Sequence, residues 1–180
     1  MGVDQLAPRA VFLDRDGVLN AVIVRDGRPH PPRGLNELTI YPDVPGGLAR
    51  LKRAGFSLVV VTNQPDVARG AQTRDGVDAL NAHLKSALPL DEVRVCFHDD
   101  ADGCSCRKPL PGLLTAAPLY DLARSFMVGD RWRDIEAGQH AGCRTVFIDR
   151  EYNERVTKAD ARVRSFAEAV EWILQKDESR

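Results

Sequence analysis

The sequence has no apolar run that approaches the roughly 20 residues needed to span a bilayer. Its first ten residues, MGVDQLAPRA, also lack the basic segment followed by an apolar stretch that is typical of a secretory signal. These two absences argue against a membrane-spanning helix and against secretion. We therefore expect a cytoplasmic protein with no membrane partner.

An excess of charge of one sign is also missing, because 25 basic and 26 acidic residues leave a net charge of -1. Aromatic residues make up only 6% of the chain, and we find no basic stretch with interleaved aromatic side chains. This balance argues against broad electrostatic capture of nucleic acid. We expect a small-molecule partner, no nucleic-acid partner, and a chain that acts as a monomer.

Short apolar runs alternate with amphipathic stretches along most of the 180 residues. Bounded apolar runs indicate strands that are buried on both faces, as in a parallel sheet. The predicted strands are 10–13, 57–61, 92–96, 125–128 and 145–148, and the predicted helices are 47–54, 75–88, 111–120, 133–141 and 165–175. This alternation predicts one α/β domain over residues 1–180 with a doubly wound, mainly parallel sheet. Residues 24–36, rich in proline, glycine and arginine, indicate an exposed loop.

Polar residues directly follow three of the predicted strands. Asp14 and Asp16 follow the first strand, whereas Thr62 and Asp130 follow the second and fourth. Because ligands bind beyond the carboxyl ends of the strands in open α/β sheets, neighbouring strands would bring these side chains into one crevice. Carboxylates that lie so close repel one another unless a cation joins them, and all-oxygen ligation suits Mg²⁺.

A metal held by carboxylates, with hydroxyl and lysine donors nearby, suits phosphoryl groups. Asp14 is the candidate nucleophile, because a carboxylate can form an aspartyl-phosphate intermediate. Asp16, two residues further on, is placed to act as a general acid toward the leaving oxygen and then as a base toward water. The pattern therefore predicts a phosphatase.

Cysteine is scarce, yet three of the four cysteines lie within eleven residues. Together with one histidine they form the pattern Cys-x-His, a five-residue gap and Cys-x-Cys. The predicted ligands are Cys96, His98, Cys104 and Cys106. Three thiolates and one imidazole complete a tetrahedral structural site, and soft thiolates favour Zn²⁺ over Mg²⁺. Because Arg107 and Lys108 follow directly, a zinc loop over residues 96–108 would order these two cations.

The order of these motifs resembles that of the haloacid dehalogenase (HAD) superfamily of phosphatases. The matching elements are VFLDRDGVLN, then Thr62 after a hydrophobic strand, then Lys108, and finally Gly129-Asp130 with Asp134. The longer strings FLDRDGVLN, VVVTNQ, ARG and CRKPLPGLL resemble the histidinol-phosphate and heptose-bisphosphate phosphatase branch. The resemblance runs from about Val11 to Asp149.

The resemblance implies a role for each matching residue. Asp14 would be the nucleophile and Asp16 the general acid and base. Mg²⁺ would be held by the side chains of Asp14 and Asp130 and by the backbone carbonyl of Asp16. The remaining site residues would be Thr62 and Lys108 on the transferring phosphoryl oxygens, with Asn20, Asn63, Arg107 and Arg131 in the substrate pocket. The branch has a HAD-like Rossmannoid fold without a large cap domain, and a flap at about residues 18–36 would cover the site.

The branch also implies a substrate. The first expectation is D-glycero-D-manno-heptose 1,7-bisphosphate, cleaved by a 7-phosphatase, and the alternative is histidinol phosphate or another sugar phosphate. A bisphosphate needs cations beyond the reacting group, and the candidates are Arg107, Arg131 and the flap residues Arg25, Arg28 and Arg33. The sequence departs from the branch at Pro65-Asp66-Val67, where the usual reading is Ser-Gly-Ile.

Two interpretations other than an enzyme also account for part of this pattern. A receiver-like switch also carries a phosphorylated aspartate on a doubly wound sheet, but it stores the phosphoryl group, whereas Asp16 serves turnover. An inactive zinc-stabilised binding module would keep the cysteines and lose the acids, and here the acids are present.

Overall fold

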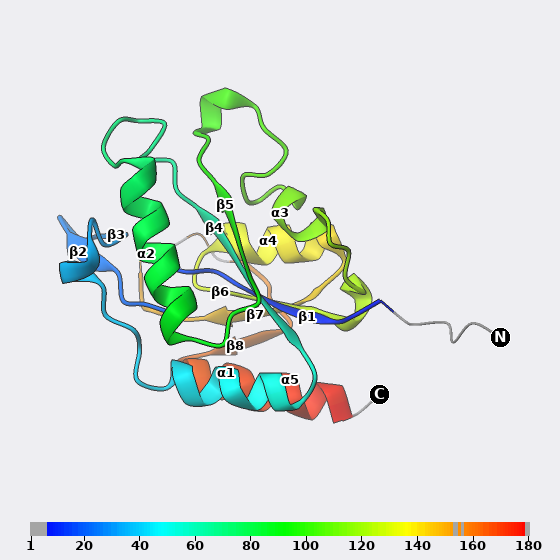
Figure 1. The fold of residues 1–180 in the computed structure, drawn as a ribbon. Coiled ribbons are helices and arrows are strands. Elements are labelled where there is room, and N and C mark those ends of the chain that lie inside the picture. Colours follow the sequence, from blue (N-terminus) through cyan, green and yellow to red (C-terminus); the bar gives the residue numbers. More distant parts are fainter. Residues whose placement is uncertain (1–6, 153–154, 156, 179–180) are drawn as a thin grey trace.

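The computed structural model describes residues 7–152, 155 and 157–178. In this part of the chain, six parallel strands form a sheet in the order β5-β4-β1-β6-β7-β8, with helices on both faces (Figure 1). The strands are β1 (Ala10–Leu13), β4 (Ser57–Asn63), β5 (Glu92–Cys96), β6 (Phe126–Gly129), β7 (Arg144–Ile148) and β8 (Ala161–Val163). The helices are α1 (Val44–Arg53), α2 (Arg74–Ala87), α3 (Gly112–Thr115), α4 (Trp132–Ala141) and α5 (Phe166–Glu178). The predicted doubly wound, mainly parallel α/β fold is confirmed.

The central strand β1 is apolar because both of its faces are buried. Val11 and Leu13 belong to the core cluster that includes side chains of α1, α2 and α5. Ala10 and Phe12 belong to a second cluster, on the other face, with side chains of α3 and α4. All four residues are 0% exposed, so the strand shows no polar alternation.

The order of the strands decides where the polar strand ends meet. β1 pairs with β4 on one side and with β6 on the other. The three predicted strand ends therefore lie next to one another at the carboxyl edge of the sheet. A small hairpin of β2 (Ile23–Arg25) and β3 (Arg28–His30) lies beyond the end of β1 (Figure 1).

The helix predicted over residues 111–120 was too long. α3 ends at Thr115, and Ala116 has an extended backbone with φ −66° and ψ 154°. Pro118 disfavours a helical conformation at the residue before it, so the helix ends ahead of the proline. Leu119, which belonged to the predicted helix, is 69% exposed.

The exposed loop predicted over residues 24–36 contains the β2–β3 hairpin instead, followed by a 3-10 turn at Leu35–Glu37. Asp26 and Gly27 at the turn have φ values of 51° and 70°. Two positive φ values are what a tight two-residue hairpin turn needs, and Asp-Gly is its commonest sequence signal. The prediction also lacked β8, a three-residue edge strand with an exposed central arginine; such a strand is too short for a recognisable pattern.

Between β1 and α1 the described residues hold only the hairpin and the 3-10 turn, and none of the described elements forms a large cap domain. A search of the same residues found no helix long and apolar enough to cross a membrane.

Close packing of α1 against α5 gives a test of the core. A Cβ atom on Gly47 would lie 2.7 Å from Cε1 of Phe166 and 3.1 Å from Cγ2 of Val170, whereas one on Gly46 would meet nothing within 4 Å. Gly47→Ala should therefore lower the free energy of unfolding by about 1–3 kcal/mol through overpacking. Gly46→Ala, in the same helix, should raise it by up to about 1 kcal/mol. Urea denaturation measures both, and equal effects at the two positions would contradict the packing.

Candidate active site

A cavity of about 700 Å³ opens at the carboxyl edge of the sheet. The sequence-predicted residues that line it are Asp14, Asp16, Thr62, Asn63, Arg107, Lys108, Asp130 and Arg131. They come from the ends of β1, β4 and β6, from the loop after β5 and from the start of α4. The topology thus brings together residues that lie more than 100 positions apart in the sequence.

Lys108 lies at the floor of this cavity and is only 2% exposed. Its Nζ donates to Oδ1 of Asp14 at 2.8 Å and to the carbonyl oxygen of Val61 at 2.7 Å. It also forms an ion pair with Oδ1 of Asp134 at 2.6 Å. Three acceptors match the three donors of an ammonium group. Burial alone would lower the pKa of Lys108, but Asp134 and Asp14 outweigh it and raise the pKa, so the lysine stays charged.

Three acidic side chains, Asp14, Asp130 and Asp134, have oxygens within 4.8 Å of one another. Burial and the Asp134 carboxylate raise the pKa of Asp14 to about 7 against the opposing effect of Lys108. Burial, Asp14 and Asp134 likewise raise the pKa of Asp130 well above its usual value. One lysine therefore does not compensate the cluster. Among the described residues, Oδ1 of Asp130 is buried with no hydrogen-bond partner, which leaves it available to a cation.

Asp16 has different surroundings and lies outside this cluster. Its carboxylate accepts hydrogen bonds from Nε and Nη2 of Arg15 at 3.1 and 2.9 Å. Asn20 Nδ2 and Gln64 Nε2 each donate to it at 2.9 Å. Burial raises the pKa of Asp16, but Arg15 and the hydrogen bonds from Asn20 and Gln64 outweigh burial, so the pKa is lowered. The resting site therefore holds Asp16 as a carboxylate in a defined orientation.

Known proteins are similar to this chain in sequence and in fold. A family model described as HAD-hydrolase-like matches residues 105–171. The chain is 35% identical to the D-glycero-D-manno-heptose-1,7-bisphosphate 7-phosphatase of Thermosynechococcus vestitus over 191 aligned positions, which cover 91% of this chain and 94% of that protein. The chain belongs to the HAD superfamily of phosphatases. It is also 33% identical to the D-glycero-beta-D-manno-heptose-1,7-bisphosphate 7-phosphatase of Escherichia coli K12, with 92% and 87% coverage.

The fold agrees with this membership. A crystal structure of a D,D-heptose 1,7-bisphosphate phosphatase from B. bronchiseptica, complexed with magnesium and phosphate, matches with a TM-score of 0.77 and 29% identity. The match covers 93% of this chain and 99% of that chain. The predicted HAD-like Rossmannoid fold is confirmed, and this HAD phosphatase is a phosphoric monoester hydrolase.

The two asparagines expected in the substrate pocket lie in different places. Asn20 is 0% exposed and is not among the residues that line the cavity, and its Nδ2 donates to Asp16. Asn63 does line the cavity, but its side chain pairs with the backbone of Lys108: Nδ2 donates to the carbonyl oxygen at 3.1 Å, and Oδ1 accepts from the N–H at 3.1 Å. Both asparagines hold a neighbouring site residue in place.

Sequence reasoning missed two further residues that orient Asp16. Arg15 is fully buried and donates through Nη1 to Oδ1 of Asn81 on α2 at 2.9 Å. Gln64, 2% exposed, donates to Oγ1 of Thr62 as well as to Asp16. Both residues stand beside named motif residues, but nothing in the sequence shows which way their side chains point.

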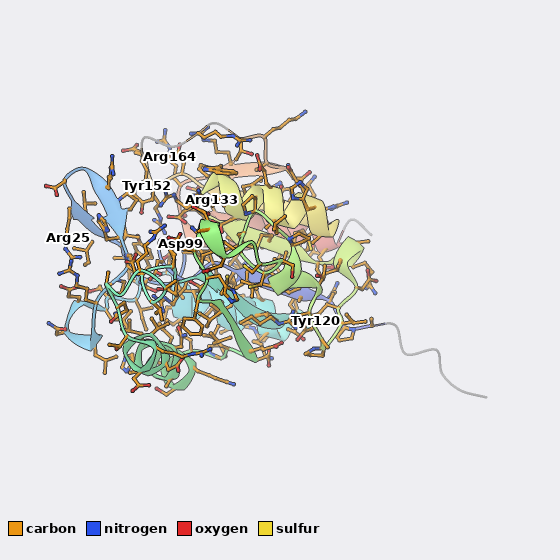
Figure 2. All side chains as sticks on the ribbon, turned by 90° about the horizontal axis from the view of Figure 1, so that it is seen from above. Arg25, Asp99, Tyr120, Arg133, Tyr152 and Arg164 are labelled. Atoms are coloured by element: carbon orange, nitrogen blue, oxygen red, sulfur yellow. The ribbon has the colours of Figure 1, made fainter. Side chains whose placement is uncertain are left out.

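The cavity wall includes the hairpin residues 26–31, and Arg133 and Tyr152, both labelled in Figure 2, line it from α4 and from the segment after β7. That residues 18–36 form a flap that covers the site remains a prediction. Val18 and Leu19 at its start are 0% exposed and belong to the core. The segment that reaches the cavity is therefore the hairpin.

The four predicted zinc ligands also lie together. Their ligand atoms all lie within 4.8 Å of one another, and the sulfur–sulfur distances run from 3.1 Å, between Cys96 and Cys106, to 3.7 Å, between Cys96 and Cys104. Zn–S bonds of about 2.3 Å place tetrahedral thiolates about 3.8 Å apart. Burial raises the pKa of Cys96 to about 12, so metal binding there would have to displace a proton.

Gly17 gives a test of the acidic cluster. Its φ is +89°, and a Cβ atom there would lie 1.8 Å from Oδ2 of Asp130. Gly17→Ala should displace Asp130 and reduce phosphate release from p-nitrophenyl phosphate by about 100-fold or more, since a 1 Å misplacement in an active site has an effect of this size. Gly142→Ala is the matched control, because Gly142 has φ +84° and open space around its Cβ position. A Gly17→Ala enzyme as active as the Gly142→Ala enzyme would contradict this geometry.

Proposed function

We propose that this phosphatase removes the 7-phosphate of D-glycero-D-manno-heptose 1,7-bisphosphate. The observation that carries the proposal is the layout of the cavity, which joins the acidic cluster around Asp14 to the arginines Arg107, Arg131 and Arg133. The acidic end suits the reacting phosphoryl group, and the arginines suit a second phosphate. Two relatives of similar length act on this substrate by name.

We propose that Mg²⁺ is bound by the side chains of Asp14 and Asp130 and by the backbone carbonyl of Asp16. The fit rests on the buried, unpartnered Oδ1 of Asp130 and on the raised pKa values of Asp14 and Asp130, because both favour a bound cation. When bound, the ion would neutralise charge on the phosphoryl oxygens and favour the ionised nucleophile. Asp134 would take no part as a ligand, since both of its oxygens are engaged, one by Lys108 and one by the backbone N–H of Arg131.

The residues of the chain supply the remaining chemistry. An oxygen of Asp14 would attack phosphorus and form an aspartyl-phosphate, while the bond to the leaving sugar oxygen breaks. Lys108 and the hydroxyl of Thr62 would hold the transferring oxygens. Asp16 would protonate the leaving oxygen and then take a proton from the water that hydrolyses the intermediate.

The lowered pKa of Asp16 is compatible with this acid role. In the resting site Arg15, Asn20 and Gln64 favour the carboxylate. A phosphoryl group bound beside Asp16 brings negative charge, which raises the pKa of a neighbouring carboxyl group. The proton would thus be taken up when substrate binds.

We further propose a structural Zn²⁺ at Cys96, His98, Cys104 and Cys106, and a monomer that works in the cytoplasm. The zinc proposal is supported by the four clustered ligand atoms. Reduced, clustered cysteines are typical of a reducing compartment.

The substrate proposal predicts a ranking of phosphate release with Mg²⁺. The value of kcat/KM should be at least about tenfold higher for the heptose bisphosphate than for fructose 1,6-bisphosphate, a hexose monophosphate or histidinol phosphate. Asp14→Asn should reduce release by about 10³-fold or more, because it removes the nucleophile. Asp26→Asn, also on the cavity wall, is the matched charge control and should keep most of the activity.

The alternative substrate and the receiver-like switch each predict a different result in this assay. A higher kcat/KM for histidinol phosphate would overturn the heptose assignment and favour the alternative substrate. A labelled Asp14 with a long-lived phosphoryl group and no turnover would favour a receiver-like switch.

The zinc proposal predicts about one zinc atom per chain by elemental analysis, and loss of that zinc in Cys104→Ser. Cys143→Ser is the matched control: Cys143 is 7% exposed and lies outside the cluster, so this variant should keep its zinc. Protein that was never exposed to chelator and contains no zinc would refute the assignment.

A further inference from the structure

Two loops that rise above the carboxyl edge of the sheet are joined at their base by a hydrogen bond from the N–H of Gln64 to the carbonyl oxygen of Cys96 at 2.8 Å, and further out by an ion pair. One is the segment 64–72 after β4, and the other is the zinc loop 96–108 after β5 (Figure 1). Arg69 of the first loop donates through Nε and Nη2 to the two carboxylate oxygens of Asp99 in the second, at 2.7 and 2.6 Å. Asp99 is labelled in Figure 2. A bidentate arginine–carboxylate contact fixes the relative orientation of the two side chains as well as the distance between them.

Asp99 in turn organises the segment that holds Arg107. Its Oδ1 accepts from the N–H of Asp100 at 2.8 Å, and its own N–H donates to Oδ2 of Asp102 at 2.7 Å, which closes a short 3-10 turn, η2 (Asp100–Asp102). Asp100 at the start of this turn accepts from Nε of Arg107 at 2.7 Å. The guanidinium of Arg107 also reaches the carbonyl oxygen of His98 at 3.4 Å.

Lys108, the next residue, is held by different groups. Its backbone pairs with Asn63 at the end of β4, and its ammonium group is held by Asp14, Asp134 and Val61. None of these groups belongs to either of the two loops. Displacement of residues 97–107 of the zinc loop would therefore move Arg107 and leave Lys108 in place.

We infer that Arg69 is a positioning residue: through Asp99 it ties the zinc loop to the loop after β4 and aims Arg107 at the non-reacting phosphate of the substrate. The inference rests on the proposed function, because it assigns Arg107 to that second phosphate. The side chains of Arg69 and Asp99 are 46% and 28% exposed, and pairs this exposed contribute little to stability. The consequence is therefore a change in substrate binding and not a loss of fold.

The test compares Arg69→Gln, Arg69→Lys and Arg107→Gln on the heptose bisphosphate and on p-nitrophenyl phosphate, which has no second phosphate. Arg69→Gln should raise KM for the bisphosphate about three- to fivefold, the upper end of what the loss of one exposed ion pair costs. Its kcat, and both constants for p-nitrophenyl phosphate, should stay within about twofold. Arg69→Lys keeps the positive charge but loses the planar guanidinium that donates to both carboxylate oxygens. Its KM for the bisphosphate should therefore lie between those of wild type and Arg69→Gln.

A double-mutant cycle separates this role from a merely structural one. If Arg69 acts through Arg107, adding Arg69→Gln to Arg107→Gln should raise KM no further. Arg50→Gln is the matched control, because it removes an exposed ion pair, with Glu171 at 2.5 Å, far from the cavity; it should leave every constant unchanged. Additive effects in the cycle, or equal losses on both substrates, would overturn the inference.

Hydrogen exchange gives a readout that needs no turnover. In zinc-loaded protein, Arg69→Gln should speed amide exchange in residues 97–107 and leave zinc content unchanged. Unchanged exchange would overturn the coupling of the two loops. A wild-type enzyme inactive on the bisphosphate would instead overturn the proposed substrate, and the exchange result would still decide whether Arg69 orders the zinc loop.

Discussion

The site depends on one buried ammonium group. Lys108 reaches Asp14 after β1, the carbonyl oxygen of Val61 in β4 and Asp134 in α4, so a single cation joins three elements of the sheet edge. An unpaired charge so deeply buried would be very unfavourable, and the three acceptors compensate it. The same contacts orient the ammonium group of Lys108 toward Asp14, the proposed nucleophile.

The acidic cluster and the parallel sheet depend on each other. Parallel strands buried on both faces need apolar side chains along their length, so polar groups can appear only where the strands end. At the end of β1, Gly17 lets the chain turn so close to Asp130 that no side chain would fit between them. Burial, together with the repulsion between carboxylates forced so close, raises the pKa values of Asp14 and Asp130 and favours a bound cation.

The two acids of the first motif differ because their surroundings differ. Asp14 is buried and lies close to other carboxylates. Asp16 instead accepts hydrogen bonds from Arg15, Asn20 and Gln64. These opposed environments suit the two roles proposed for them, a nucleophile and a residue that carries protons. The partners of Asp16 come from its own turn and from Gln64, the residue that follows β4, so the pairing of β1 with β4 also supports this division.

Much of this was predictable from the sequence, because local patterns carry it. The five longer strands, four of the five helices and the clustering of Asp14, Thr62 and Asp130 follow from apolar runs and from the residues at their ends, whereas Lys108 was expected in the site from the resemblance to the HAD superfamily. The β2–β3 hairpin was predictable from Asp26-Gly27, although the proline and arginine content of the segment hid the signal. The end of α3 ahead of Pro118 needed more weight on the residue before a proline.

By itself, the sequence determined the α/β alternation, the acidic strand ends and the spacing of the four clustered cysteine and histidine residues, because each is a local pattern within a few residues. Only the tertiary structure decided which neighbour each polar side chain meets. It paired Asn20 with Asp16 and Asn63 with the backbone of Lys108, brought Arg15 and Gln64 to Asp16, and paired Arg69 with Asp99 across 30 positions of sequence. Side-chain direction depends on packing from several elements at once, and a linear pattern does not contain that information.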